Sequence, residues 1–239
     1  MSRIVAIHQP NLFPWLGYFN KIFRSDSFII LDQVQFPKKG GSWVNRVRLL
    51  INGNGSWITA PVDRNYHGYK MIREITFSSP EWAERTIKTI EANYSRSPFF
   101  KEIFPVMQDL ILYPTNSLTD YNLNFITSLL GLLNVSHGEL ILGSALKAQG
   151  HATDLLISLV QEVGGNCYLC GGGAAGYQED DMFLNAGLEL RYQTFNHPIY
   201  PQRNSSSFVP GLSIIDVLMN IGIDQMRALC QNWRESRHE

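Results

Sequence analysis

The chain has 239 residues, a formal net charge of −1, and 44% hydrophobic against 17% charged residues. This length and composition suit one globular α/β domain, expected here over residues 1–239, with room for insertions. A net charge so close to zero gives no general attraction to nucleic acid or to an acidic membrane surface, so neither is expected as a partner. No apolar window is long enough for a membrane span, and the first strand begins too early to leave room for a signal peptide, so we expect a cytoplasmic protein.

The three cysteines do not indicate a disulfide framework, because their number is odd. Cys167 and Cys170 have the spacing of a metal or redox pair, but they fall in an expected strand, where residues three apart face opposite sides. No second cysteine pair or spaced histidine pair accompanies them, so we expect buried thiols and no metal site. The sequence leaves the cofactor unknown.

Residues 4–32 have the pattern of a strand, a helix and a second strand. Two short apolar runs without alternation, 4–7 and 28–31, are typical of parallel strands buried on both faces, and the amphipathic stretch between them predicts a helix. Ligands of parallel sheets bind beyond the carboxyl ends of the strands. The polar side chains expected there are His8, Gln9, Asn11 and Asp32.

The loop between the first strand and the helix allows two interpretations. Its prolines and the aromatic residues Trp15 and Tyr18 fit a rigid connection packed on the core. Gly17, in the first turn of the helix, instead offers a backbone whose free N–H groups suit an anion. A histidine, a glutamine and an asparagine within four residues of a strand end favour a ligand site.

Residues 33–78 predict a β-rich insertion after the second strand. Alternation over 45–51, an Asn-Gly turn and a return over 57–62 indicate a β-hairpin, and a further short strand is expected over 72–77. Candidate substrate-binding side chains gather in this insertion: Gln35, Lys38, Lys39, Trp43, Asn45 and Arg46.

The basic residues of this insertion also allow two interpretations. Arginine forks bind phosphate or carboxylate, whereas lysines on an edge strand protect it from aggregation. Function is favoured for Arg46, which has Trp43 and Asn45 beside it. The following residues, 79–135, predict a helical insertion that starts with a serine cap and a proline, and we find no catalytic spacing in it.

Alternating strands and helices resume from residue 139. The strand over 166–170 runs straight into a glycine-rich turn, where the residues expected to contact a ligand are Gly171, Gly172, Gly173 and Tyr177. Glycine lets a phosphate approach backbone N–H groups. The turn matches neither the dinucleotide-binding G-x-G-x-x-G pattern nor a Walker loop, and a simple tight turn is the alternative.

The final strand, expected over 188–194, leads into a long polar loop on the ligand side of the sheet. This loop contributes His197, Tyr200 and Gln202 as candidate site residues. Two helices are expected after it, over 213–221 and 223–233. Ser213 is the predicted N-cap of the first and a further candidate for substrate contact.

Several of these blocks resemble the WbqC-like protein family, over nearly the whole chain. The first and last blocks are the most specific: His8-Gln9-Pro10-Asn11 with Pro14-Trp15-Leu16-Gly17-Tyr18-Phe19, and His197-Pro198 with Tyr200-Pro201-Gln202 and Leu212-Ser213-Ile214-Ile215-Asp216. Between them lie Asp32, Gln35-Phe36, Trp43, Asn45-Arg46 and the glycine-rich turn. The resemblance implies a bacterial protein linked to O-antigen and other surface-polysaccharide gene clusters.

A fold-level resemblance connects the chain to HIGH-type nucleotidyltransferases, such as pantothenate synthetase and cytidylyltransferases. In these enzymes the first strand leads to a His-x-Gly-His helix start, whose place is taken here by Trp15-Leu16-Gly17-Tyr18. The glycine is kept, and both phosphate-binding histidines are absent. The resemblance implies a Rossmann-like parallel sheet of the nucleotidyltransferase or HUP type, with a site at the start of this helix.

Together these features predict an enzyme of surface-polysaccharide biosynthesis that transfers an acyl or aminoacyl group to a sugar or sugar-nucleotide precursor. His8 or His197 is the expected general base, since neutral imidazole takes up a proton near pH 7, and Asp32 is the third catalytic candidate. The expected partners are the sugar or sugar-nucleotide substrate and an acyl or aminoacyl carrier. The alternatives are a nucleotidyltransferase-like enzyme and a protein that binds a sugar nucleotide or carrier without catalysis.

Overall fold

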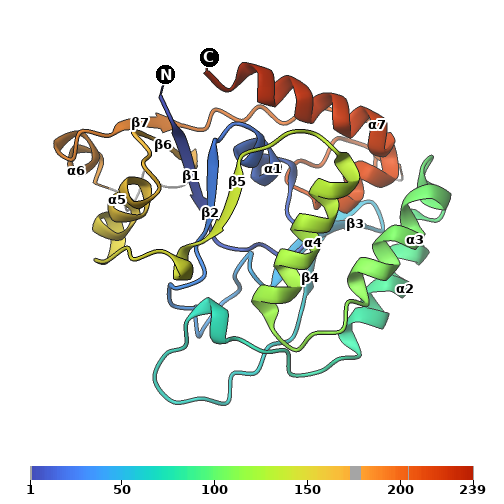
Figure 1. The fold of residues 1–239 in the computed structure, drawn as a ribbon. Helices are drawn as coiled ribbons and strands as arrows, with labels where there is room; N and C mark the ends of the chain where they lie inside the picture. Colours follow the sequence, from blue (N-terminus) through green and yellow to red (C-terminus); the bar gives the residue numbers. More distant parts are fainter. Residues whose placement is uncertain (1, 173–178, 204, 239) are drawn as a thin grey trace.

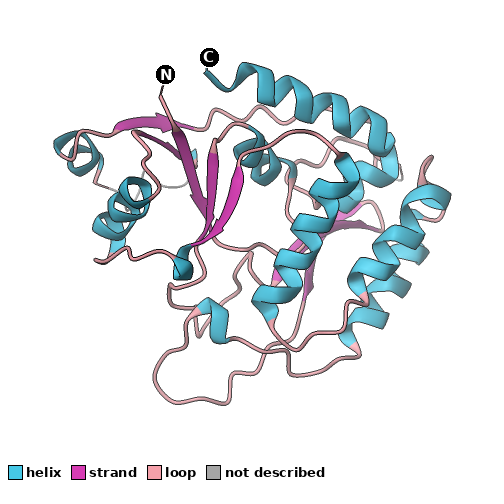
Figure 2. Cartoon of the chain, viewed as in Figure 1, coloured by secondary structure: helices cyan, strands magenta, loops and turns pink. Residues whose placement is uncertain are grey.

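The computed structural model describes residues 2–172, 179–203 and 205–238. A sheet of five parallel strands runs through its centre, in the order β5–β2–β1–β6–β7 (Figures 1 and 2). The strands are β1 (Ile4–His8), β2 (Ser27–Ile30), β5 (Glu139–Leu142), β6 (Cys167–Cys170) and β7 (Glu189–Tyr192). This parallel sheet flanked by helices confirms the predicted Rossmann-like α/β fold.

Helices cover both faces of the sheet, because the strands carry apolar side chains on both sides. In β1, Ile4 and Ala6 join the core under α1 (Leu16–Phe23) and α7 (Ile214–Glu235). Val5 and Ile7 join a separate core under α5 (Ala152–Glu162) and α6 (Asp180–Asn185). Successive residues of a strand point to opposite faces, so a strand without polar alternation needs a cover on each side.

The segments expected as insertions follow β2. The hairpin consists of β3 (Arg46–Ile51) and β4 (Asn54–Thr59), paired antiparallel in a sheet of their own. The prediction of a strand over 72–77 is wrong, because Ile72–Glu74 forms a 3₁₀ turn. The Glu74 carboxylate stabilises this turn by accepting a hydrogen bond from the Met71 backbone N–H (2.7 Å). Three helices come next: α2 (Trp82–Tyr94), α3 (Phe100–Ile111) and α4 (Leu118–Leu133).

The loop between β1 and α1 is held by buried contacts. Asn122 of α4 donates through its side-chain amide to the carbonyls of Pro10 (2.9 Å) and Val44 (2.7 Å), which joins the loop to the base of the hairpin. Phe13 has a φ of 40°, an uncommon value for a residue with a Cβ, and its buried ring packs against Phe125, with 4.8 Å between centroids. Backbone strain of this kind persists only where the surroundings impose it, and it is frequent beside functional sites.

The last helix contains the break that was expected between residues 221 and 223. α7 continues across Gly222, whose φ of 77° and ψ of 177° are not helical. A Cβ at this position would lie 2.6 Å from the Phe99 ring, so both the backbone and the available space require glycine. Across the described residues, no helix combines the length and the apolar character that crossing a bilayer demands.

Candidate functional site

The strand order marks the carboxyl ends of β1 and β6 as the candidate ligand site. From β1 the sheet grows outward through β2 and β5, and the chain then crosses back to add β6 and β7 on the other side of β1. Ligands of open α/β sheets bind where the strand order reverses in this way. Residues 4–6 of β1 pair with residues 167–169 of β6. The two strands therefore separate before the end of β1, where His8 lies.

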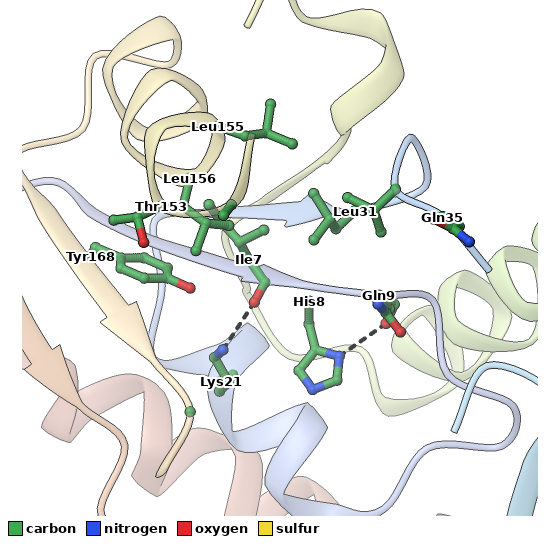
Figure 3. A pocket seen from close by; sticks show the side chains of 13 residues that line it. Ile7, His8, Gln9, Lys21, Leu31, Gln35, Thr153, Leu155, Leu156 and Tyr168 are labelled. Atoms are coloured by element: carbon green, nitrogen blue, oxygen red, sulfur yellow. Dashed lines mark hydrogen bonds between the residues drawn. The ribbon is translucent and has the colours of Figure 1, made fainter. Parts of the chain in front are cut away.

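The first of two cavities at this point, here called the aliphatic lobe, has a volume of about 490 Å³. It lies between the ends of β1 and β2 and the start of α5, and α1 and α5 approach it from opposite sides of β1 (Figure 3). Its lining residues are Ile7, His8, Gln9, Lys21, Leu31, Val34, Gln35, Ala152, Thr153, Leu155, Leu156, Tyr168 and Gly171.

The second cavity, here called the aromatic lobe, has a volume of about 330 Å³. It lies between α1, the turn after β6 and the segment after β7. Its lining residues are His8, Trp15, Gly17, Tyr18, Lys21, Gly171, Gly172, Gln193 and Phe195. Both volumes fall in the range of roughly 300–1,000 Å³ that is usual for small-molecule sites.

Among the residues that the structure describes, three line both lobes: His8, Lys21 and Gly171. They come from the end of β1, from α1 and from the turn after β6. A Cβ on Gly171 or Gly172 would meet no atom of another described residue within 4 Å, so among the described residues the glycines leave open space at this turn. The structure thus brings segments more than 160 residues apart, from His8 to Gly171, to two adjoining cavities, here together called the two-lobed cleft.

Lys21 is a buried charged residue of this cleft. Its side chain is 3% exposed, and its ammonium donates a hydrogen bond to the Ile7 carbonyl (3.1 Å), near the point where β1 and β6 part (Figure 3). Burial lowers the pKa of Lys21 from 10.5 to about 8, and the neighbouring Cys170 thiol opposes that change. A fraction of this amine is therefore neutral near pH 7, the state in which a lysine can accept a proton.

His8 lies half-buried beside Lys21. Burial first, and the positive charge of Lys21 second, lower the pKa of His8 from 6.5 to about 3, while its Nδ1 contact with the Gln9 carbonyl (3.0 Å) opposes them. The ring packs edge-on against Tyr18, whose own pKa is raised by burial. His8 is neutral near pH 7 but a weak base, so it suits hydrogen bonding to a ligand better than taking up a proton.

Gly17 makes room for Trp15 across the start of α1. A Cβ on Gly17 would lie 2.2 Å from the Trp15 ring. The same ring packs against Phe195 (5.3 Å between centroids) and stacks on His197 (6.4 Å). His197 therefore lies behind Trp15 and lines neither lobe, and burial lowers its pKa. Its predicted role as a base stays a prediction.

Asp32 follows β2 but is bound to the turn after β5. Its carboxylate accepts hydrogen bonds from the backbone N–H (2.9 Å) and the hydroxyl (2.6 Å) of Ser144, in the 3₁₀ turn Gly143–Ala145. The side chain is buried and lines neither lobe. The structure gives Asp32 a positioning contact, and its catalytic role stays a prediction.

Near the start of α7, the side chains of Tyr200, Gln202 and Ser213 form hydrogen bonds within the protein. The Tyr200 hydroxyl (2.7 Å) and the Gln202 amide (3.2 Å) donate to the Asp216 carboxylate, which also accepts from the Tyr94 hydroxyl (2.9 Å). Ser213 is fully buried and caps the helix. All three side chains have partners within the protein, and their substrate contacts stay predictions.

The basic and aromatic candidates around the hairpin line neither lobe: Lys38, Lys39, Trp43, Asn45 and Arg46. The Arg46 guanidinium lies 4.3 Å from the centroid of Trp57, whose ring meets Trp43 at 5.0 Å. Gln35, from the same segment, does line the aliphatic lobe.

The remaining candidates come from the β1–α1 loop and from the glycine-rich turn. Gln9 lines the aliphatic lobe, whereas Asn11 is buried in the loop and lines neither lobe. Gly173 and Tyr177 lie outside the described residues. Within the described ranges, no group of three or more His, Cys, Asp or Glu side chains is placed to hold a metal ion.

Lys21 and Gln193 are among the residues of the cleft that were not predicted as site residues. Lys21 lies four residues after Gly17 on the same face of α1, and this spacing is the signal that could have identified it. Gln193 donates through its amide to the Gly17 carbonyl (2.7 Å) and to the Asn20 side chain (2.8 Å). No sequence pattern marks Gln193, because its partners are more than 170 residues away.

Comparison with known proteins supplies the relatives of this chain. The model of the WbqC-like protein family matches residues 9–228. A protein of Mycobacterium tuberculosis (strain ATCC 25618 / H37Rv), named Uncharacterized protein Rv1507c, is 32% identical over 230 residues, which cover 92% of this chain and 94% of that protein. No solved structure matches the chain. On the strength of a family match that spans most of its length, the chain belongs to the WbqC-like protein family.

Proposed function

We propose that this protein is a group-transferring enzyme of surface-polysaccharide biosynthesis that binds a sugar or sugar-nucleotide substrate in the two-lobed cleft. The WbqC-like family suggests O-antigen-related biosynthesis as the setting. The observation that carries the proposal is the convergence of His8, Lys21 and Gly171 on both lobes, where the strand order reverses. The transferred group is an acyl or aminoacyl unit brought by a carrier.

Lys21 is the general base in this proposal, in place of His8. Its pKa of about 8 keeps part of the amine neutral near pH 7, whereas the pKa of about 3 makes His8 a poor proton acceptor. The amine takes the proton from an acceptor hydroxyl or amino group as that group bonds to the acyl carbon. The carrier leaves with the electron pair of the broken bond and receives the proton from Lys21. The neutral His8 ring orients the substrate by hydrogen bonding.

A thermal-shift screen of sugar nucleotides, nucleotides and acyl-carrier thioesters tests which class binds. A ligand present at about 100 times its Kd stabilises the fold by about 2.7 kcal/mol, which raises the Tm of a chain of this size by about 5–10 °C. We expect sugar nucleotides to produce such a shift. If no compound in the screen shifts the Tm, the proposal is wrong.

Turnover is then measured with the Lys21→Met variant. Loss of a general base lowers kcat by roughly 10²–10⁴-fold. The Lys88→Met variant is the control, since Lys88 is an exposed lysine of α2, and it is expected to keep full activity. Sugar-nucleotide binding without turnover on any carrier would instead favour a binding protein. Metal-dependent ATP or CTP binding would favour the nucleotidyltransferase alternative.

A further inference from the structure

We infer that the aliphatic lobe binds the hydrocarbon part of the acyl donor, a linear chain of several methylene groups whose carbonyl end lies beside Lys21. This inference rests on the proposed function and names the class of its donor. It assigns the two lobes to two substrates, with the acyl chain in the aliphatic lobe and the sugar acceptor in the aromatic lobe.

The walls of the aliphatic lobe carry apolar side chains from opposite directions. Ile7 and Leu31 come from the ends of β1 and β2, while Leu155 and Leu156 come from the start of α5 (Figure 3). Leu31, Leu155 and Leu156 pack on the core under α5 and yet are only half-buried. Aliphatic surface that faces a cavity is unfavourable in contact with water, so a hydrocarbon chain would stabilise these side chains.

The polar end of the lobe suits the head of an acyl group. Lys21 uses one N–H donor on the Ile7 carbonyl, and an ammonium has three donors in all. Figure 3 shows Lys21 and His8 on the side of β1 opposite to Leu155 and Leu156. Lys21 and His8 nevertheless line the same cavity as the two leucines, so a chain lying between the leucines can place its carbonyl or carboxylate end beside a cation and a neutral imidazole.

The two lobes differ in the surfaces that they offer. Five Ile, Leu or Val side chains line the aliphatic lobe, whereas none occurs among the described residues that line the aromatic lobe. The aromatic lobe has three aromatic residues, Trp15, Tyr18 and Phe195, where the aliphatic lobe has Tyr168. Two of its glycines, Gly171 and Gly172, leave open space among the described residues. Flat rings and open backbone suit a sugar or a sugar nucleotide, whereas the cluster of aliphatic side chains in the other lobe suits a hydrocarbon chain. Lys21 lines both lobes and therefore lies between the two substrates.

The test is the affinity of butanoate, hexanoate and octanoate, measured by isothermal titration calorimetry with the full chain. Each methylene group moved out of water tightens binding about fourfold, so octanoate, with four more of them, is expected to bind roughly 250-fold more tightly than butanoate. Equal affinity for the three acids, or no binding of octanoate, would overturn the inference.

Two substitutions locate the bound chain. Leu156→Trp fills the lobe and is expected to weaken octanoate binding at least tenfold, whereas Leu184→Trp, at a residue of α6 that is 62% exposed, leaves it unchanged. Leu156→Ala enlarges the lobe and shifts the preference toward decanoate, which provides a second readout if the tryptophan variant fails to fold. The inference would be overturned if octanoate affinity were unchanged in both Leu156 variants. It would also be overturned if a nucleoside competed with octanoate for the wild type and lost its affinity in Leu156→Trp.

Sugar-nucleotide binding, followed in the same variants, separates this inference from the proposed function. We expect it to survive Leu156→Trp, because that residue does not line the aromatic lobe. If sugar nucleotides bind but the affinity for the acids does not depend on their length, only the acyl assignment is wrong. If the affinity depends on acid length but no sugar nucleotide binds, only the proposed function is wrong.

Discussion

Burial of the Lys21 amine lowers the free energy of unfolding by an amount that depends on pH. Its pKa falls from 10.5 in the unfolded chain to about 8 in the folded protein. Between these two values the unfolded chain binds more protons, so the free energy of unfolding rises with pH from about 8 to about 10.5. Below about pH 8 the buried charge costs about 3 kcal/mol, which the Ile7 hydrogen bond offsets in part.

We predict that Lys21→Met raises the free energy of unfolding at pH 7 by about 1–3 kcal/mol and abolishes the rise between pH 8 and 10.5. The reason is that methionine fills a similar volume without a charge to bury. Urea unfolding at pH 7 and at pH 9.5 measures both effects, with Lys88→Met as the exposed control. A variant less stable than the wild type, with the pH slope unchanged, would contradict the assignment of this pKa to Lys21.

At the level of elements, a buried polar cluster sets the start of α7. Asp216, in its first turn, accepts hydrogen bonds from Tyr200, Tyr94 and Gln202. Burial raises the pKa of Asp216, and these three donors oppose the change by stabilising the carboxylate. Through Asp216, the cluster connects α7 to the loop after β7, which carries Tyr200 and Gln202, and to α2, which carries Tyr94.

We predict that Tyr200→Phe lowers the free energy of unfolding by about 1–3 kcal/mol, because a buried carboxylate loses a donor. Sugar-nucleotide affinity should stay within twofold of the wild type, since Tyr200 lines neither lobe. Tyr113→Phe, at an exposed tyrosine, is the control for stability. A Tyr200→Phe variant of unchanged stability but much weaker binding would instead support the predicted substrate contact of Tyr200.

For the whole molecule, α7 is the element that connects the helical segment to the sheet. It packs against α1, which covers the sheet, and also against α3 and α4 (Figure 1). The bend at Gly222 lets the two halves of α7 follow these different neighbours. Its φ and ψ lie in a region that only glycine occupies readily.

We predict that Gly222→Ala lowers the free energy of unfolding by about 2–4 kcal/mol, because it combines backbone strain with a clash against Phe99. Ligand affinity of the folded fraction is expected to be unchanged, since Gly222 lines neither lobe. Gly131→Ala is the matched control: it lies within α4 with open space around it, and alanine there should stabilise the helix by about 0.5–1 kcal/mol. Equal Tm values for the two variants would contradict this account of the bend.

Local patterns were sufficient to predict the parallel sheet, the hairpin, the helical segment and the break in α7. Unalternated apolar runs, an Asn-Gly turn and an isolated glycine act over a few residues, so they can be recognised without knowledge of the fold. The same reasoning placed His8, Gln9 and Gly171 after strands, and all three line the cleft. It failed over 72–77, where the Glu74 carboxylate caps a 3₁₀ turn in place of a strand.

Only the tertiary structure decided which polar side chains face the cleft. Asp32 and Tyr200 were predicted as site residues, and the structure adds that they bind Ser144 and Asp216 and line neither lobe. The Asp32 partner lies 112 residues away in the chain. In the sequence, Lys21 is one residue of an amphipathic helix. In the folded protein its amine lies beside the Ile7 carbonyl, near the point where β1 and β6 part. A strand or a turn is stabilised by its immediate neighbours, whereas the partner and the protonation state of a buried polar group depend on chain segments that meet only on folding.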